Sequence, residues 1–111
     1  MAPQVATIAS PAAGVTRILL RAPQALTISQ VDAVLSGGTS PSVSFSLRHG
    51  ADISATGTAV TTDPITVTST TTGQAIDSFQ SAQIPLEHWL WLEVTAISGV
   101  PQALTVAVQF S

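Results

Sequence analysis

The chain has 111 residues, of which only 8% are charged, and it contains three arginines, no lysine and no cysteine. A chain of this length forms one domain with one core, and the lack of cysteine excludes both a disulfide framework and a thiolate site. A formal net charge of −3 without any basic stripe argues against nucleic acid as a partner, and no apolar run approaches the ~20 residues that span a bilayer.

The first 14 residues are rich in alanine and proline and have no strong periodicity. Pro3 and Pro11 break any helix, and the segment lacks the basic flank and compact apolar stretch of a secretory signal peptide. We therefore predict an extended N-terminal arm over residues 1–14 and a single domain over residues 15–111. Such an arm either frays, as termini commonly do, or lies over a neighbouring subunit.

From residue 15 onward, apolar and polar residues alternate with the period of a strand, and no segment has the apolar spacing of a helix. In the second of these strands the apolar phase slips at Ser29 and Gln30, which predicts a β-bulge or a strand that bends between sheets. Pro85 confines the segment around it to a sheet edge or a crossing loop. Strands are predicted over residues 15–21, 25–35, 42–48, 65–68, 74–79, 90–97 and 103–110, with room for one more within 51–63.

Two stretches, 25–48 and 90–110, have the clearest alternation and are each predicted to form a hairpin. In 90–110, a register that pairs Leu92 with Val108 puts the apolar residues of both strands on the same face of the hairpin. A slip of one residue would put them on opposite faces. Seven or eight short strands with turns at these intervals predict an all-β fold: a single antiparallel β-sandwich, jelly-roll-like in type.

The candidate binding residues lie at two places. Trp89 and Trp91, together with Glu87, have the parity opposite to the buried row of strand 90–97, which aims both indoles outward. Exposed tryptophans indicate either a subunit interface, which they anchor, or a platform for a sugar ring with Glu87 beside it; alternatively, Trp89 covers the end of the core. Arg17 and Arg21 lie four apart on one face of their strand and are interpreted as a solvated or interfacial pair.

The sequence has no pattern that indicates catalysis. His49 and His88 are far apart and have only Asp52 and Glu87 near them, whereas a zinc site needs three or four converging ligands. They are interpreted as surface histidines at strand ends, and no metal or cofactor is predicted. Neither a G-x-S-x-G elbow nor an acidic pair occurs, so we do not expect an enzyme.

The surface chemistry predicts self-association. Exposed edge strands are usually protected by lysine, other charges or proline, and this chain has few charges to use in that way. We therefore expect a homo-oligomer, with a trimer favoured, in which neighbours cover edges and faces.

Two stretches carry a resemblance to a known class of proteins: RILLRAPQALTISQVDAVLSGGTSPSVSFSLRHG and LWLEVTAISGVPQALTVAVQF. They resemble small β-sandwich domains of virion structural proteins of tailed bacteriophages. In that class a strand ending in "RAP" leads to an "alTI..V.a.l" strand, a later strand ends in a His-Gly or Asn-Gly turn, and the final strands carry a "v.v...sG.....L.V.v.f" hairpin. The resemblance covers Val15 to Phe110 and rests on turns and alternation.

The resemblance implies a non-enzymatic part of a virion that is assembled in the host cytoplasm. It implies a capsid decoration or cement protein, a head fibre or a tail-fibre module, with other virion proteins such as the major capsid protein as partners. The short arm and the single domain favour a decoration or head-attached role. The alternative is an adsorption module that binds host surface carbohydrate through Trp89 and Trp91.

Overall fold

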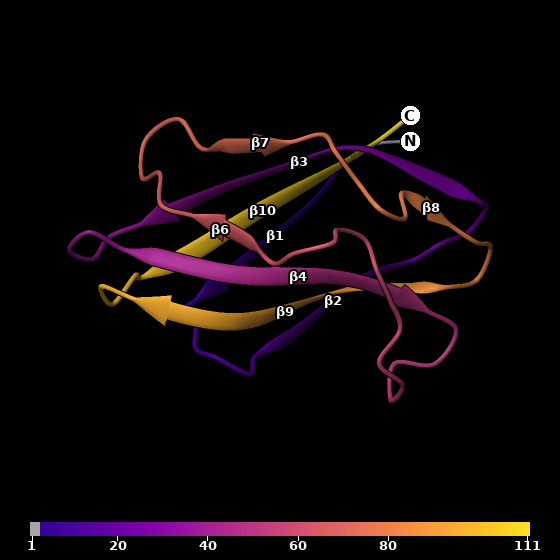
Figure 1. Ribbon diagram of the computed structural model, residues 1–111, viewed down its shortest axis with the longest axis horizontal. Helices are drawn as coiled ribbons and strands as arrows, with labels where there is room; N and C mark the ends of the chain where they lie inside the picture. Colours follow the sequence, from indigo (N-terminus) through magenta and orange to yellow (C-terminus); the bar gives the residue numbers. More distant parts are fainter. Residues whose placement is uncertain (1–2) are drawn as a thin grey trace.

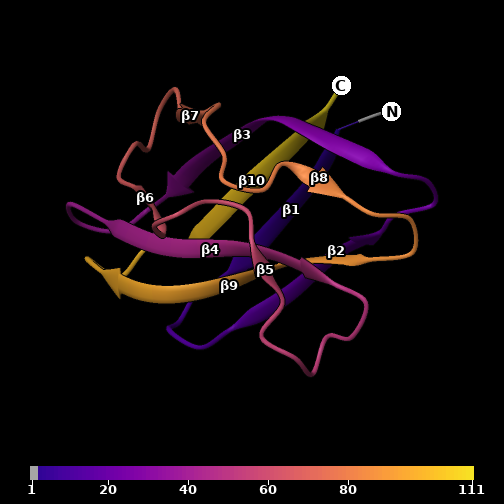
Figure 2. The same ribbon diagram turned by 45° about the vertical axis from the view of Figure 1, so that its right-hand side comes forward.

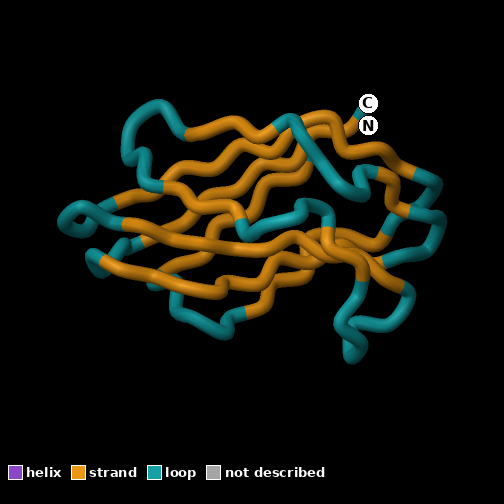
Figure 3. The backbone as a smooth tube through the Cα atoms, in the orientation of Figure 1, coloured by secondary structure: helices purple, strands orange, loops and turns teal. Residues whose placement is uncertain are grey.

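The computed structural model describes residues 3–111, and this part of the chain is all-β without any helix (Figures 1 and 3). None of its segments is therefore a helix able to cross a membrane. The strands are β1 (Gln4–Ala9), β2 (Thr16–Arg21), β3 (Leu26–Ser36), β4 (Ser42–Gly50), β5 (Thr58–Ala59), β6 (Ile65–Val67), β7 (Gln74–Ile76), β8 (Gln83–Ile84), β9 (Trp89–Ser98) and β10 (Ala103–Phe110).

The strands form two five-stranded antiparallel sheets that face each other (Figure 2). Sheet A has the order β1-β10-β3-β7, with β8 also paired to β3; sheet B has the order β2-β9-β4-β5, with β6 also paired to β4. Because β7 and β8 share one side of β3, and β5 and β6 share one side of β4, the ten strands fill the eight positions of a jelly roll. The predicted sandwich is confirmed.

The core lies between the sheets and is built from the alternating apolar rows that the sequence displays. Phe45 and Leu47 on β4, Leu92 on β9, and Leu104 and Val108 on β10 are completely buried. Their inward direction follows from the two-residue period of a strand, which sends every second side chain into the sandwich.

The predicted hairpin over residues 90–110 is wrong. Strand β9 pairs with β2 and β4 in sheet B, whereas β10 pairs with β1 and β3 in sheet A, so the chain between them crosses from one sheet to the other (Figure 1). The stretch 25–48 behaves in the same way, because β3 belongs to sheet A and β4 to sheet B. Both stretches are arches whose inner rows face one another across the core instead of lying side by side.

The two arches stack on each other at one end of the sandwich. The Thr39 N–H donates a hydrogen bond of 2.9 Å to the Gly99 carbonyl, and the Gln102 N–H donates one of 2.8 Å to the Ser36 carbonyl. A Cβ on Gly99, where φ is +73°, would lie 2.7 Å from the Cα of Pro41. Glycine therefore permits both the left-handed backbone and the close approach of the two turns.

Bulges change which side chains face the core. The predicted bulge near Ser29 is confirmed, because the β10–β3 register skips that residue opposite Gln109 and Phe110. A second bulge at Thr95 shifts the register of β9 against β4. Beyond it, Ile97 pairs with the inward-facing Val43 and so lies on the inner side of sheet B, where 39% of it remains exposed.

The segment predicted as an arm contributes the first strand of the jelly roll. Residues 4–9 form β1 and pair with β10, where Ile8 is buried opposite Leu104. The alternation in this segment is weak because only Ile8 in its inward row is a large apolar residue, beside Gln4 and Ala6. Residues 10–14 then cross to sheet B, where the Gly14 N–H donates to the Val94 carbonyl at 2.8 Å. Residues 1–2 of the expected arm lie outside the described part of the chain.

Candidate functional site

Trp91 does not form part of an exposed platform. It occupies the outer side of β9, as its parity predicted, but only 3% of it is exposed. The loop of residues 51–57, which follows β4, folds back over the ring, and a Cβ on Gly57 would lie 2.6 Å from Cη2 of Trp91. The expectation that both indoles are open to solvent is therefore wrong for Trp91, whose cover comes from a loop of small residues.

Trp89 is half-buried at the start of β9 and lies beside two charged side chains. The guanidinium carbon of Arg21 is 5.7 Å from the centre of the Trp89 ring, within the range of a cation–π contact. Arg21 also pairs with Glu87, with 3.8 Å between Nη2 and Oε2, and both side chains are more than half exposed. We call Arg21, Glu87 and Trp89 the β9 corner. It unites three of the five predicted site residues, and Trp89 is not among the core residues.

The backbone that carries the corner is tied to the end of β2. Ala22 accepts a hydrogen bond from the Glu87 N–H at 2.8 Å and donates one to the His88 carbonyl at 2.8 Å, while the His88 N–H donates to the Pro85 carbonyl at 3.1 Å. Glu87 adopts a φ of +67°, an unusual conformation for a residue with a side chain. These bonds hold the turn of residues 85–88 in one conformation and fix the position from which the Glu87 side chain projects into solvent.

Arg17 lies apart from this corner. The β2–β9 register skips Leu19, so Arg17 pairs with the inward-facing Leu92, whereas Arg21 pairs with the outward-facing Trp89. The two arginines therefore lie on opposite faces, contrary to the prediction. Arg17 Nη1 instead donates a hydrogen bond of 3.2 Å to the Thr7 carbonyl on the edge strand β1. A charge on an edge carbonyl blocks that site against pairing with another strand.

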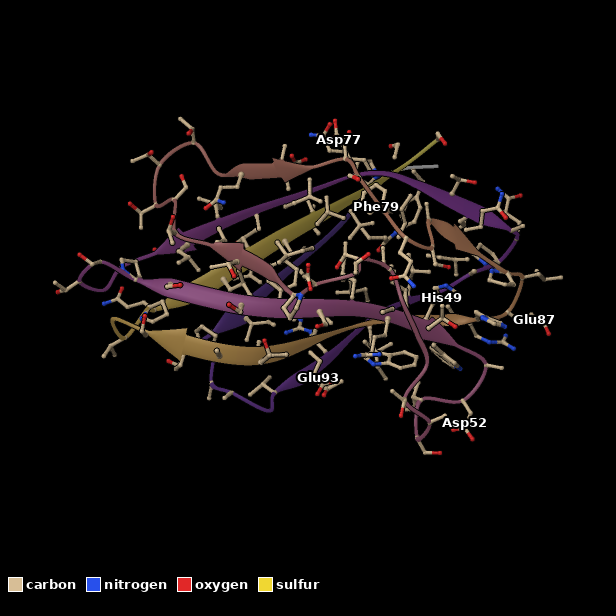
Figure 4. All side chains as sticks on the ribbon, in the orientation of Figure 1. His49, Asp52, Asp77, Phe79, Glu87 and Glu93 are labelled. Carbon is tan, nitrogen blue, oxygen red and sulfur yellow. The ribbon has the colours of Figure 1, made fainter. Side chains whose placement is uncertain are left out.

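The two histidines meet, although 39 residues separate them. His49 and His88 approach with 3.4 Å between their Nδ1 atoms, and Nε2 of His49 lies 3.4 Å from the hydroxyl of Ser81. His49 is only 4% exposed, so the expectation of two separate surface histidines is wrong. Burial, and secondarily the neighbouring His88, lower the pKa of His49. Asp52 takes no part in the pair, since the Ser54 hydroxyl and N–H hold its carboxylate and lower its pKa (Figure 4).

A shallow groove on the outer face of sheet A was missed by the sequence reasoning. It encloses about 220 Å³ and is lined by Asp32, Val34, Thr105, Ala107 and residues 72–75, which lead into β7. The Asp32 carboxylate is held by the side-chain amides of Gln30 at 2.6 Å and Gln109 at 2.7 Å. The residues are small and scattered over three strands, so no local signal marks the groove. Among residues 3–111, no three His, Cys, Asp or Glu gather as a candidate metal site.

Comparison with known proteins adds a likeness of fold. No family model and no curated protein matches the chain. Among solved structures, it is similar to CBM32 of AlyQ in complex with 4,5-unsaturated mannuronic acid, with a TM-score of 0.62 and 20% identity over 95% of this chain and 76% of that chain. At this identity the likeness supports the β-sandwich architecture and leaves residue roles to the geometry above.

Proposed function

We propose that the protein is a non-enzymatic structural protein of a phage virion, a capsid decoration, cement or head-attached protein that acts as a homo-oligomer, with a trimer favoured. The observation that carries this proposal is the outer face of sheet A, which is a broad surface almost without charge. Faces of this kind on lysine-poor proteins associate with a partner more readily than they remain in solvent.

The composition of that face supports the proposal. Its rows pair Val5 with Ala107 and Thr7 with Thr105, and Val34 follows next to Thr105 on β3. Val5 is 64% exposed, and the Thr7 and Thr105 hydroxyls satisfy each other at 3.1 Å. Asp32 is the one charged residue in the groove, and its two amide partners reduce the cost of covering it. The face can therefore be buried at small electrostatic cost.

The positions of the resembling motifs also support a virion role. The Arg21-Ala22-Pro23 motif stands at the end of β2, directly before β3, and His49-Gly50 ends β4. These two positions agree with the pattern of phage β-sandwich domains, whereas the final hairpin of that pattern is replaced here by an arch between the two sheets. The localisation in a virion and the contact with other virion proteins are part of this proposal.

Light scattering coupled to size-exclusion chromatography tests self-association through sheet A. We expect a mass near three times the 11.3 kDa of one chain. Replacing Ala107 with arginine in the centre of the face should lower that mass, because the partner cannot solvate the added cation. Ala55→Arg, on the exposed loop 51–57, is the matched control and should leave the mass unchanged. Equal masses for the two variants would place the interface elsewhere.

A second candidate function is carbohydrate binding at the β9 corner. A half-exposed indole with an arginine and a carboxylate beside it offers one apolar surface and both signs of charge to a sugar. The similar solved structure is a complex with an unsaturated mannuronic acid, so uronate oligosaccharides are the first probe. Their carboxylate matches Arg21.

Isothermal titration with uronate oligosaccharides tests this candidate. We expect Trp89→Ala and Arg21→Gln each to weaken binding at least about tenfold, the loss of one good contact. Arg17→Gln, on the opposite face of β2, is the control and should bind normally. If the unaltered protein, shown to be folded, binds no saccharide, this second function fails while the structural role is untouched.

A further inference from the structure

The His49–His88 contact joins two parts of the fold at the β9 corner. His49 stands at the end of β4, and His88 belongs to the turn that carries Glu87 and leads into Trp89. The two rings are tilted by 40°, with centroids 5.6 Å apart and Nδ1 atoms 3.4 Å apart. Each neutral imidazole has one N–H and one free lone pair, so the contact is a hydrogen bond when one Nδ1 carries the proton and the other accepts it.

The surroundings of the pair offer no compensation for extra positive charge. The Ser81 hydroxyl is the neighbour of His49 on its other side, and Asp52 is bonded to Ser54. The nearest carboxylate to His88 along the chain belongs to Glu87, which already pairs with Arg21. Arg48 precedes His49 on the opposite face of β4 and would add repulsion. Among the described residues no anion pairs with either ring.

We propose that the His49–His88 pair is a proton-sensitive latch that holds the turn of residues 85–88 against the end of β4 and releases it on acidification. When both rings are protonated, both Nδ1 atoms carry N–H groups that face each other across the same short contact, so the hydrogen bond is lost and two cations repel. The turn moves because it is the shorter and more exposed partner, whereas His49 is fixed in a paired strand.

The displacement reaches the β9 corner through the backbone. His88 lies between Glu87 and Trp89, and its carbonyl and the Glu87 N–H are both bonded to Ala22. Release of the His88 ring therefore strains the bonds that position the Glu87 carboxylate and the start of β9. If the β9 corner binds saccharide, its affinity for saccharide falls at acidic pH. This consequence rests on the second candidate function.

The direction of the pH dependence follows from linkage. The pKa of His49 is lowered in the folded state by burial and by His88, below the usual value of 6.5 that it regains on unfolding. Above that value both states are neutral at this site and the latch contributes fully. As the pH falls below it, the unfolded state takes up the proton first, so the free energy of unfolding decreases until the folded-state pKa is passed.

Histidine-detected NMR and tryptophan fluorescence in the ligand-free full chain, with EDTA present, test the latch between about pH 7.5 and 5. We expect the His49 ring to titrate below its usual value, as its burial and the neighbouring His88 require, and the Trp89 emission to change over the same range. His88→Gln should remove the fluorescence change and leave the fold intact. The fluorescence is measured in the Trp91→Phe variant, in which Trp89 is the remaining tryptophan and therefore the source of the emission.

Two results would overturn the proposal. One is titration of His49 at or above the usual histidine value, and the other is a Trp89 signal that stays constant while His49 titrates. Both readouts are obtained without saccharide, so a failure of carbohydrate binding leaves this test intact. If His88→Gln does not fold, the ring titrations of the unaltered protein decide the question alone.

Discussion

Replacing Trp91 with alanine lowers the free energy of unfolding by about 3–5 kcal/mol, the range for removing a large buried aromatic side chain. The indole is 3% exposed between sheet B and the loop 51–57, and its loss leaves a cavity that the strand cannot close. Urea denaturation followed by circular dichroism measures the change. The midpoint should fall while the slope stays constant, because the fold itself persists.

Trp89→Ala is the matched control for that experiment. Trp89 is half-buried on the outer side of sheet B, and its main partner is the exposed Arg21. We expect its removal to lower the free energy of unfolding by about 1 kcal/mol, in line with the loss of an exposed cation–π contact. Equal effects of the two substitutions would contradict the burial of Trp91 under the loop.

Gly99→Ala should be the most damaging of the glycine substitutions in the turns. Gly99 has a positive φ, and a Cβ there would lie 2.7 Å from both the Pro41 Cα and the Ser40 carbonyl oxygen. The left-handed conformation alone costs an alanine about 1–2 kcal/mol, and forcing two backbones apart adds a cost of about 1–3 kcal/mol. Thermal unfolding monitored by circular dichroism measures the sum.

Gly14→Ala separates the two contributions. Gly14 also has a positive φ, of +91°, but no atom lies within 4 Å of the position of its Cβ. Its substitution therefore reports the conformational cost without the steric one. If Gly99→Ala were no worse than Gly14→Ala, the two arches would not be stacked, and the crossing of residues 99–102 between sheets would need revision.

The strands could be predicted from the sequence because alternation is a local property, but their partners could not. Leu92 and Val108 point into the same core whether β9 and β10 form a hairpin or an arch. The choice depends on how the turns at Gly38 and Gly99 stack, which is a contact between distant parts of the chain. The weak alternation of residues 4–9 hid an edge strand for a different reason, since Gln4 and Ala6 on its inner side bury little apolar area.

For the site residues, too, the local features could be predicted from the sequence and the contacts between distant parts of the chain could not. The parity of Trp89 and Trp91 predicted the outer face correctly, yet the cover over Trp91 comes from a loop without any pattern. The bulge at Leu19 has no sequence signature, and it alone separates Arg17 from Arg21. His49 and His88 meet because β4 and β9 are neighbours in sheet B, a pairing between distant strands that local alternation does not reveal.

An electron-microscopy map of a purified tailed phage particle whose genome encodes this chain tests the proposed function most directly. We expect jelly-roll density attached to the particle, in oligomers, with the outer face of sheet A covered by a neighbouring copy or another virion protein. Particles that lack this density, and lack the protein on gels of the same preparation, would contradict it.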